Sequence, residues 1–106
     1  LDVVEVWKTS WENKDMEGYL NSYATNFKYP NNMNKASWEK YRTSRIISKK
    51  KIDILLSKIK LKFTKETIVV NFIQNYKSGK LNQSSNKTLV FVEENGEWLI
   101  LEEISK

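Results

Sequence analysis

The segment 35–49 contains cationic side chains that could bind an anion, spaced at helical intervals from a tryptophan. If the segment is a helix, they fall within roughly 60° of one another and form one stripe: Trp38, Arg42, Arg45 and Lys49. If Trp38 faces the core, at least one of the two arginines faces inward as well. A guanidinium group stays charged in proteins, so its burial requires a carboxylate partner or a bound anion. The stripe therefore predicts an internal ion pair or an anion site.

A carboxylate in the last predicted strand could supply that ion pair. Alternation along a strand places Glu102 on the same face as the apolar residues Trp98 and Ile100. Pairing of Glu102 with an arginine and binding of an external anion are about equally compatible with this pattern. Of the two arginines, we expect Arg42 to pair with Glu102 and Arg45 to face a ligand.

The segment 66–78 contains a strand face that changes character along its length. Its inward positions begin with apolar side chains and end with Gln74 and Tyr76. Such a change occurs where a strand end runs into water or where a strand lines a pocket, and we favour the pocket. Lys87, in the following strand, places a second cation in an apolar row.

The composition removes several classes of active site. The chain has no cysteine and no histidine, which excludes thiol nucleophiles, disulfides, imidazole bases and the usual zinc sites. Glu39 and Glu102 remain as candidate bases. Glu39 lies about 90° from the stripe, and an arginine would neutralise Glu102. We therefore expect no catalytic residue, no metal and no cofactor.

Helical periodicity dominates the first half of the chain. Apolar and aromatic residues recur at helical spacing near the N-terminus, and Asp15 is suited to cap the second helix. The only proline and several asparagines mark a turn, with a short extended piece before Pro30. The predicted helices are 2–13, 15–24 and 35–49.

From Lys51 onward the pattern changes to the alternation of strands. The dipeptide Asn95-Gly96 signals a tight hairpin, and the stretch GKLNQSS reads as a loop. The predicted strands are 51–63, 66–78, 86–94 and 97–105. Helices followed by an antiparallel meander predict an α+β domain.

The basic charge of the chain is concentrated in its middle third. Residues 28–65 carry a net charge of +10, although the whole chain has only +5. Such a region can attract nucleic acid or an anionic glycan, or simply keep the protein in solution. The aromatic side chains are predicted to face the core rather than this surface, which makes nucleic acid an unfavoured partner. No apolar run reaches the length of a membrane-spanning helix.

The order of these elements resembles the nuclear transport factor 2-like superfamily, which includes SnoaL-like cyclases and ketosteroid isomerases. Several stretches are also similar to the C-terminal accessory domain of bacterial periplasmic peptidoglycan-trimming proteins, which carry an L,D-transpeptidase-type catalytic domain: VWKTSWENKDMEGYLNSYATNF, SWEKYRTSRI, VNFIQNYKS, NKTLVF and EWLILEE. The resemblance implies one cone-shaped domain over residues 1–106, with three helices packed on a curved sheet of four long strands and with room for one short strand. It also implies a cavity at one end of the cone.

We therefore expect a non-catalytic ligand-binding or accessory domain of the cell envelope, with a periplasmic location by resemblance alone and a cytoplasmic one left open. Its expected partners are a glycan, a peptide or a small anionic ligand, together with an attached catalytic domain. The pocket residues implied are Tyr23, Trp38, Arg42, Arg45, Gln74, Tyr76, Lys87, Trp98 and Glu102.

Two alternatives remain open at this point. A ketosteroid isomerase-type enzyme would use a pocket carboxylate as its base and a tyrosine or protonated acid as oxyanion donor. A dimerisation module would pair two copies through outward apolar residues of the sheet: Val69, Ile73, Val90 and Leu99.

Overall fold

The computed structural model describes residues 2–106, in which three α-helices precede four strands. A short 3-10 helix, Pro30–Asn32, leads into the third α-helix. The helices are α1 (Asp2–Glu12), α2 (Met16–Leu20) and α3 (Lys35–Ile47), and the strands are β1 (Asp53–Phe63), β2 (Thr67–Ser78), β3 (Leu81–Glu94) and β4 (Glu97–Ser105).

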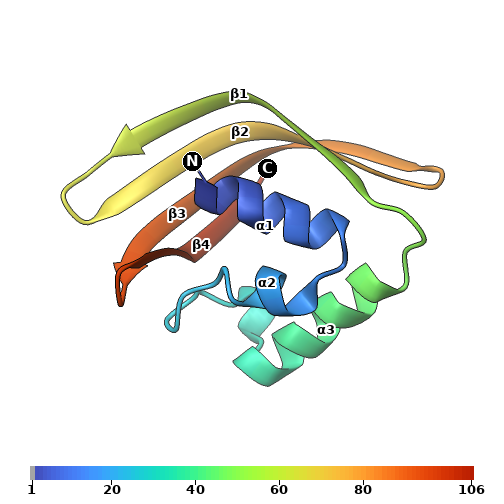
Figure 1. The fold of residues 1–106 in the computed structure, drawn as a ribbon, viewed down its shortest axis with the longest axis horizontal. Coiled ribbons are helices and arrows are strands. Elements are labelled where there is room, and N and C mark those ends of the chain that lie inside the picture. Colours follow the sequence, from blue (N-terminus) through green and yellow to red (C-terminus); the bar gives the residue numbers. More distant parts are fainter. Residues whose placement is uncertain (1) are drawn as a thin grey trace.

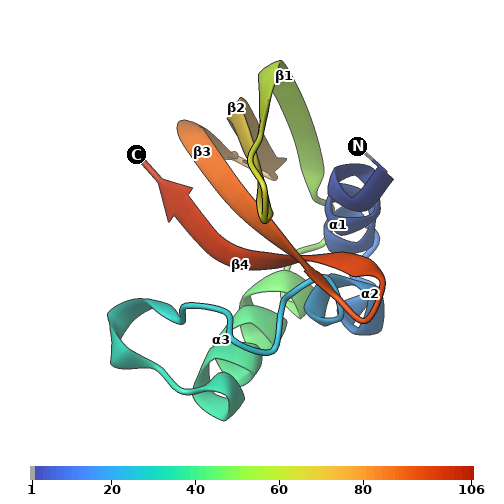
Figure 2. The same ribbon diagram turned by 90° about the vertical axis from the view of Figure 1, so that its left-hand side faces the viewer.

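The four strands form one antiparallel sheet in the order β1-β2-β3-β4. The sheet curves over the helices, which lie on its concave side (Figure 1). The second view shows α1 below β1 and α3 below β4 (Figure 2). Three helices packed on a curved antiparallel sheet confirm the predicted α+β fold class.

The core fills the space between the helices and the concave face of the sheet. Val70, Leu89 and Ile100 are fully buried at alternate positions of β2, β3 and β4. Burial of each such side chain contributes about 1.5–3 kcal/mol to folding. From α1, Trp7 and Trp11 reach the same core at a spacing of one helical turn.

Strand β3 begins earlier than the sequence predicts. The stretch GKLNQSS was expected to be a loop, but Leu81 already pairs with Ser78, and the ladder continues without interruption. The turn is therefore a two-residue hairpin loop formed by Gly79 and Lys80, in which Gly79 adopts φ of 58°. The residues of the expected loop are polar because this end of the hairpin is mostly exposed.

Strand β4 contains an irregularity that alters its alternation. Phe91 pairs with Ile100, whereas the preceding residue Val90 pairs with Glu102, so Leu101 is an extra residue on β4. Beyond this bulge the inward and outward positions exchange. As a result Glu103, and not Glu102, lies on the concave face with Ile100.

The second helix is shorter than the predicted span 15–24 because it ends at Leu20. Asp15 caps it as expected, accepting a hydrogen bond from the backbone of Gly18 (3.1 Å). The chain then runs alongside β4, where Tyr23 forms an isolated parallel bridge with Ile100. The sequence predicts a short extended piece just before Pro30. The structure instead has this single bridge, seven residues earlier, at Tyr23.

Within residues 2–106, no helix is long and apolar enough to cross a membrane.

Candidate functional site

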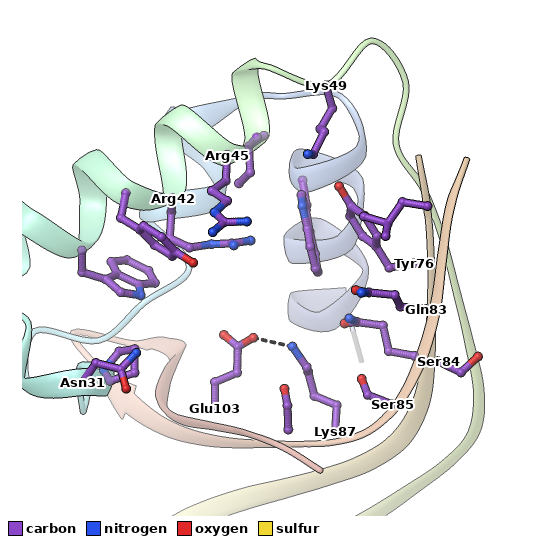
Figure 3. Close-up of a pocket in the computed structure, with 18 of the residues that line it drawn as sticks. Asn31, Arg42, Arg45, Lys49, Tyr76, Gln83, Ser84, Ser85, Lys87 and Glu103 are labelled. Carbon is purple, nitrogen blue, oxygen red and sulfur yellow. Dashed lines mark hydrogen bonds and ion pairs between the residues drawn. The ribbon is translucent and has the colours of Figure 1, made fainter. Parts of the chain in front are cut away.

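A cavity of about 920 Å³ lies between α3 and the concave face of the sheet. Side chains from α1, α3, β2, β3 and β4 surround it (Figure 3). Aromatic rings form part of the wall, and polar or charged groups form much of the rest: Asn31, Arg42, Arg45, Lys49, Gln74, Gln83, Ser84, Ser85, Lys87, Glu103 and Ser105.

Helix α3 provides one wall of this cavity. Its capping box fixes the start of the helix, because Asn34 Oδ1 accepts from the Ser37 backbone (2.8 Å) and Ser37 Oγ accepts from the Asn34 backbone (3.1 Å). From this start, the helical period places every member of the predicted stripe on the cavity side: Trp38, Arg42, Arg45 and Lys49.

Arg42 is the most enclosed cation of α3. Its guanidinium carbon lies 5.4 Å from the ring centre of Trp11 and 5.6 Å from that of Tyr19. Its Nε donates a hydrogen bond to the Tyr19 hydroxyl (3.0 Å). Burial alone would lower the pKa of Arg42, but the hydrogen bond to Tyr19 and the negative charge of Glu103 help to raise it above its usual value. Arg42 therefore remains a cation at the cavity wall.

Helix α3 ends at Ile47, two residues short of the predicted end, so two of the three cavity-lining cations of the stripe are on α3 and Lys49 follows it. Among residues 2–106, no ion pair within 4.0 Å involves Arg42, Arg45 or Lys49. The guanidinium carbon of Arg45 lies 4.9 Å from the ring centre of Tyr41. The expected pair of Arg42 with Glu102 is wrong.

Glu102 lies elsewhere because of the bulge in β4. Its carboxylate forms a 3.5 Å ion pair with Lys28, whose side chain is largely exposed. The prediction assumed uninterrupted alternation after Ile100, and the extra residue Leu101 invalidates that assumption. Glu103 occupies the cavity wall in its place.

The carboxylate of Glu103 is already paired inside the protein. Lys87 Nζ lies 2.6 Å from Glu103 Oε2, and the Tyr23 hydroxyl donates to Glu103 Oε1 at 2.7 Å. Burial raises the pKa of this carboxyl, but the Lys87 ammonium and the Tyr23 hydrogen bond outweigh that effect and hold the pKa of Glu103 below its usual range. Lys87 and Glu103 therefore neutralise one another.

Two tyrosines connect this pair with Arg42. The Tyr23 and Tyr19 hydroxyl groups are hydrogen-bonded at 3.1 Å, and Trp7 Nε1 donates to Tyr23 (3.0 Å). Burial raises the pKa of Tyr19 to about 12 and that of Tyr23 well above its usual value. Both hydroxyls are therefore neutral at physiological pH and serve as hydrogen-bonding groups.

Gln74 and Tyr76 both line the cavity, together with Lys87. Tyr76 is half-buried and packs its ring against Trp11 with centroids 5.5 Å apart. Gln74 is almost completely buried, and its carbonyl oxygen has no hydrogen-bond partner. The change from apolar to polar residues along β2 thus coincides with the place where the strand leaves the core and borders the cavity.

Two other predicted pocket residues do not line the cavity. Tyr23 is buried behind the wall, where it supports Glu103. Trp98 pairs with Glu93 close to the β3–β4 hairpin, so it packs against the core at the opposite end of β4 from Glu103.

The sequence reasoning missed several lining residues. Gln83 and Ser85 were assigned to a loop, although alternation back from Lys87 would have placed them on its strand face. Glu103 was missed because nothing in the sequence LILEEIS marks the bulge. Within the described residues, no cluster of three or more His, Cys, Asp or Glu side chains could hold a metal ion.

Solved structures with the same fold come from several bacteria. Bd1075 from Bdellovibrio bacteriovorus is 27% identical, with a TM-score of 0.87 over 97% of this chain. The helical cell shape determining protein Pgp2 from Campylobacter jejuni is 23% identical, with a TM-score of 0.80 over 96% of this chain. The chain spans 38% of the length of each of these two proteins.

A candidate ketosteroid isomerase from Shewanella frigidimarina also shares the fold, with 14% identity and a TM-score of 0.80 over 99% of this chain and 92% of its own. The likeness to this protein and to Pgp2 shows the fold alone. A search of curated proteins found no match. The model of the Cds6 C-terminal NTF2-like domain matches residues 1–104. The chain therefore belongs to the family of Cds6 C-terminal NTF2-like domains.

Proposed function

We propose that this chain is a non-catalytic domain that binds an anionic ligand in the cavity between α3 and the sheet. The observation that supports this is the imbalance of charge. Arg42, Arg45 and Lys49 face the cavity without carboxylate partners, whereas Glu103 is paired with Lys87. Unpaired cations near one another repel, and an anion between them removes that repulsion. A guanidinium group also matches the two oxygens of a carboxylate or phosphate.

The relatives suggest a setting for such a domain. The chain corresponds to about two fifths of Bd1075 and of the cell shape determining protein Pgp2. We infer that it accompanies a catalytic domain of a peptidoglycan-modifying protein in the periplasm, as the resemblance of its sequence implies. The ligand would then be a fragment of the cell wall, such as an acidic peptide or glycan.

An isomerase is the second candidate, because the cavity contains a carboxylate and the fold occurs in a candidate ketosteroid isomerase. A general base works best with a pKa near the working pH. The pKa of Glu103 is instead held below its usual range by Lys87. The Tyr23 hydroxyl donates to Glu103 and is not free to stabilise an oxyanion. These contacts favour binding over catalysis.

We also propose that the convex face of the sheet pairs two copies of the domain. In the described part of the chain, no helix covers this face (Figures 1 and 2). Its apolar residues are only half-buried in a single copy: Val69, Ile73, Val90 and Leu99. Pairing would leave the cavity on the concave face accessible.

The binding proposal is tested by calorimetric titration of the purified domain with acetate, phosphate and a muropeptide. Arg45→Gln should weaken binding of the best ligand about tenfold, because it removes a charged hydrogen bond. Lys62→Gln is the matched control, since it removes one positive charge from an exposed site outside the cavity. Equal effects of both substitutions, or no binding by the unaltered domain, would contradict the proposal.

A further inference from the structure

Strand β1 forms an outer edge of the sheet, because β2 is its one strand neighbour in the described chain (Figure 1). In an antiparallel pair, alternate residues direct their backbone N–H and C=O groups away from the partner strand. Ile54 does so, and its N–H donates instead to Glu12 of α1 (2.8 Å). Leu61 and Phe63 lie on the same side of the ladder, because their partners in β2 alternate in step with the partner of Ile54. Within residues 2–106, their outward backbone groups have no such acceptor or donor.

The side chains along this edge are exposed on both faces of the sheet. Ile59, Leu61 and Phe63 are apolar, with exposed fractions of 52%, 41% and 65%. Lys60 and Lys62 alternate with them, point to the opposite face and are also exposed. An open edge of this kind is a template for another strand. The edge therefore presents free backbone groups, an apolar row and a cationic row.

A small cavity of about 210 Å³ lies between α1 and β1, and its lining includes Val4 of α1 and Leu56 and Ile59 of β1. Figure 2 shows α1 below this strand. A strand added beside β1 would direct every second side chain to the side of α1, where the cavity could take an apolar group. A sheet edge with pockets for alternate side chains is the arrangement by which proteins recognise extended peptides.

The charges of β1 discriminate between the strands that could occupy its edge. The strand has three lysines, Lys58, Lys60 and Lys62, and no acidic residue after Asp53. A second copy would bring these lysines close to one another, and like charges in facing positions destabilise a sheet. A strand with acidic residues at alternate positions would instead bring carboxylates beside the lysines. Charge complementarity therefore favours an acidic strand from a different polypeptide segment over a second copy.

We propose that the edge of β1 binds an extended polypeptide segment in which acidic and apolar residues alternate. The segment adds a fifth strand to the sheet, and its backbone pairs with Leu61 and Phe63. Its apolar side chains cover the exposed apolar row, and its carboxylates lie beside Lys60 and Lys62. This site is separate from the cavity between α3 and the sheet and does not depend on a ligand there.

Titration of the domain with two capped peptides, followed by NMR, tests the pattern of the partner. The peptide GSVEVEVEGS alternates valine and glutamate, whereas GSVVVEEEGS has the same composition without the alternation. The first should shift the backbone signals of segment 59–63 and slow hydrogen exchange at the amides of Leu61 and Phe63. The second should bind at least about fivefold more weakly, because it cannot match both rows of the edge.

N-methylation of the alternating peptide tests for strand pairing. In one peptide the three valines are N-methylated, and in another the three glutamates are. One of the two should lose binding, because its methyl groups replace the N–H groups that face β1, and the other should retain it. Equal effects of the two methylation patterns would overturn the proposal.

The lysines are tested by charge reversal. The double substitution Lys60→Glu and Lys62→Glu should weaken binding of the alternating peptide about tenfold. The matched control is Lys77→Glu with Lys80→Glu, which reverses two exposed charges outside β1 and should leave the affinity unchanged. Equal losses in both proteins would show that only the net charge of the domain matters and would overturn the proposal.

Three further outcomes would also overturn it. One is no binding of the alternating peptide at about 1 mM, the range of a weak complex. Another is equally tight binding of a single-stranded oligonucleotide at the same ionic strength, which would indicate general attraction of anions. The third is protection of the Leu61 and Phe63 amides that rises with domain concentration alone, which would assign the edge to a second copy. The peptide comparisons need no variant, so they decide the question even if a charge-reversed domain does not fold.

Discussion

Lys87 and Glu103 form the one ion pair of the cavity wall in the described part of the chain. Their ion pair of 2.6 Å is shielded from solvent, with side-chain exposures of 7% and 19%. Pairs of this kind cost desolvation when they form, but removal of one partner strands the other charge. The remaining cavity cations, Arg42 and Arg45 on α3 and Lys49 just after it, form no ion pair within the described chain. The ion pair is therefore expected to stabilise the fold, and ligand binding is proposed for the cations without such a partner.

Glu103→Gln should lower the free energy of unfolding by about 3 kcal/mol, because it leaves the buried Lys87 ammonium without an anion. The adjacent substitution Glu102→Gln is the matched control. Glu102 pairs only with the exposed Lys28, so its removal should cost less than about 1 kcal/mol. Denaturant unfolding monitored by tryptophan fluorescence measures both values. Equal losses would mean that the bulge does not direct Glu103 inward.

The same ion pair should make stability depend on pH in the acid range. The pKa of Glu103 is lower in the folded chain than its usual 4.5. Its contribution is therefore fully present above that value and is lost as the pH falls through the folded-state pKa. Unfolding free energies measured between pH 7 and pH 3 should decline below about pH 4.5. Glu103→Gln should decline less steeply, and an unchanged slope would contradict the assignment.

At the scale of elements, hydrophobic periodicity predicts most of the helices and strands. It does not predict two local features, the early start of β3 and the bulge in β4. The stripe of α3 follows from helical spacing, so Arg42, Arg45 and Lys49 could be placed together from the sequence. The start of β3 could not, because its polar residues resemble a loop and are held by pairing with β2. The bulge at Leu101 leaves no local signal in the sequence, and because of it the inward carboxylate is Glu103 and not the predicted Glu102.

Helix α3 carries Arg42 and Arg45, so its N-terminal capping box should affect the stability of this side of the cavity. Asn34→Ala removes one half of the capping box and should reduce stability by about 1 kcal/mol. Asn34→Asp is the control, since an aspartate accepts the same hydrogen bond from Ser37 and favours the positive end of the helix dipole. Thermal unfolding of both variants provides the comparison. A loss with Asn34→Asp as large as with alanine would show that the cap is unimportant.

At the scale of the molecule, the helices occupy the concave side of the sheet and leave its convex side uncovered within residues 2–106 (Figure 2). The overall arrangement was predictable because the period of the hydrophobic pattern changes once, from helical to alternating, near residue 51. The cavity itself was less predictable, since its wall combines residues from α1, α3 and three strands. Trp98 shares the predicted strand face but lies at the far end of the core.

Pairing of two copies through the convex face can be tested by sedimentation velocity. Val90→Lys places a charge at the centre of that face and should shift a dimer to monomer, because a buried lysine without a partner is unfavourable. Lys60→Ala, on the outer strand β1, is an exposed control that should leave the sedimentation coefficient unchanged. A monomeric wild-type domain at 100 µM, roughly a hundredfold above a micromolar dissociation constant, would contradict the pairing.

The two arginines of the cavity, which have no carboxylate partner in the described chain, should bind the carboxylate of a ligand. The chain contains two arginines, Arg42 and Arg45, so the Nε–H region of a ¹⁵N spectrum holds one signal for each. Titration with N-acetylalanine, against sodium chloride at equal ionic strength, should shift both signals along saturating curves with one dissociation constant. If neither signal moves, or if sodium chloride moves them equally, the cavity does not bind a carboxylate through these residues.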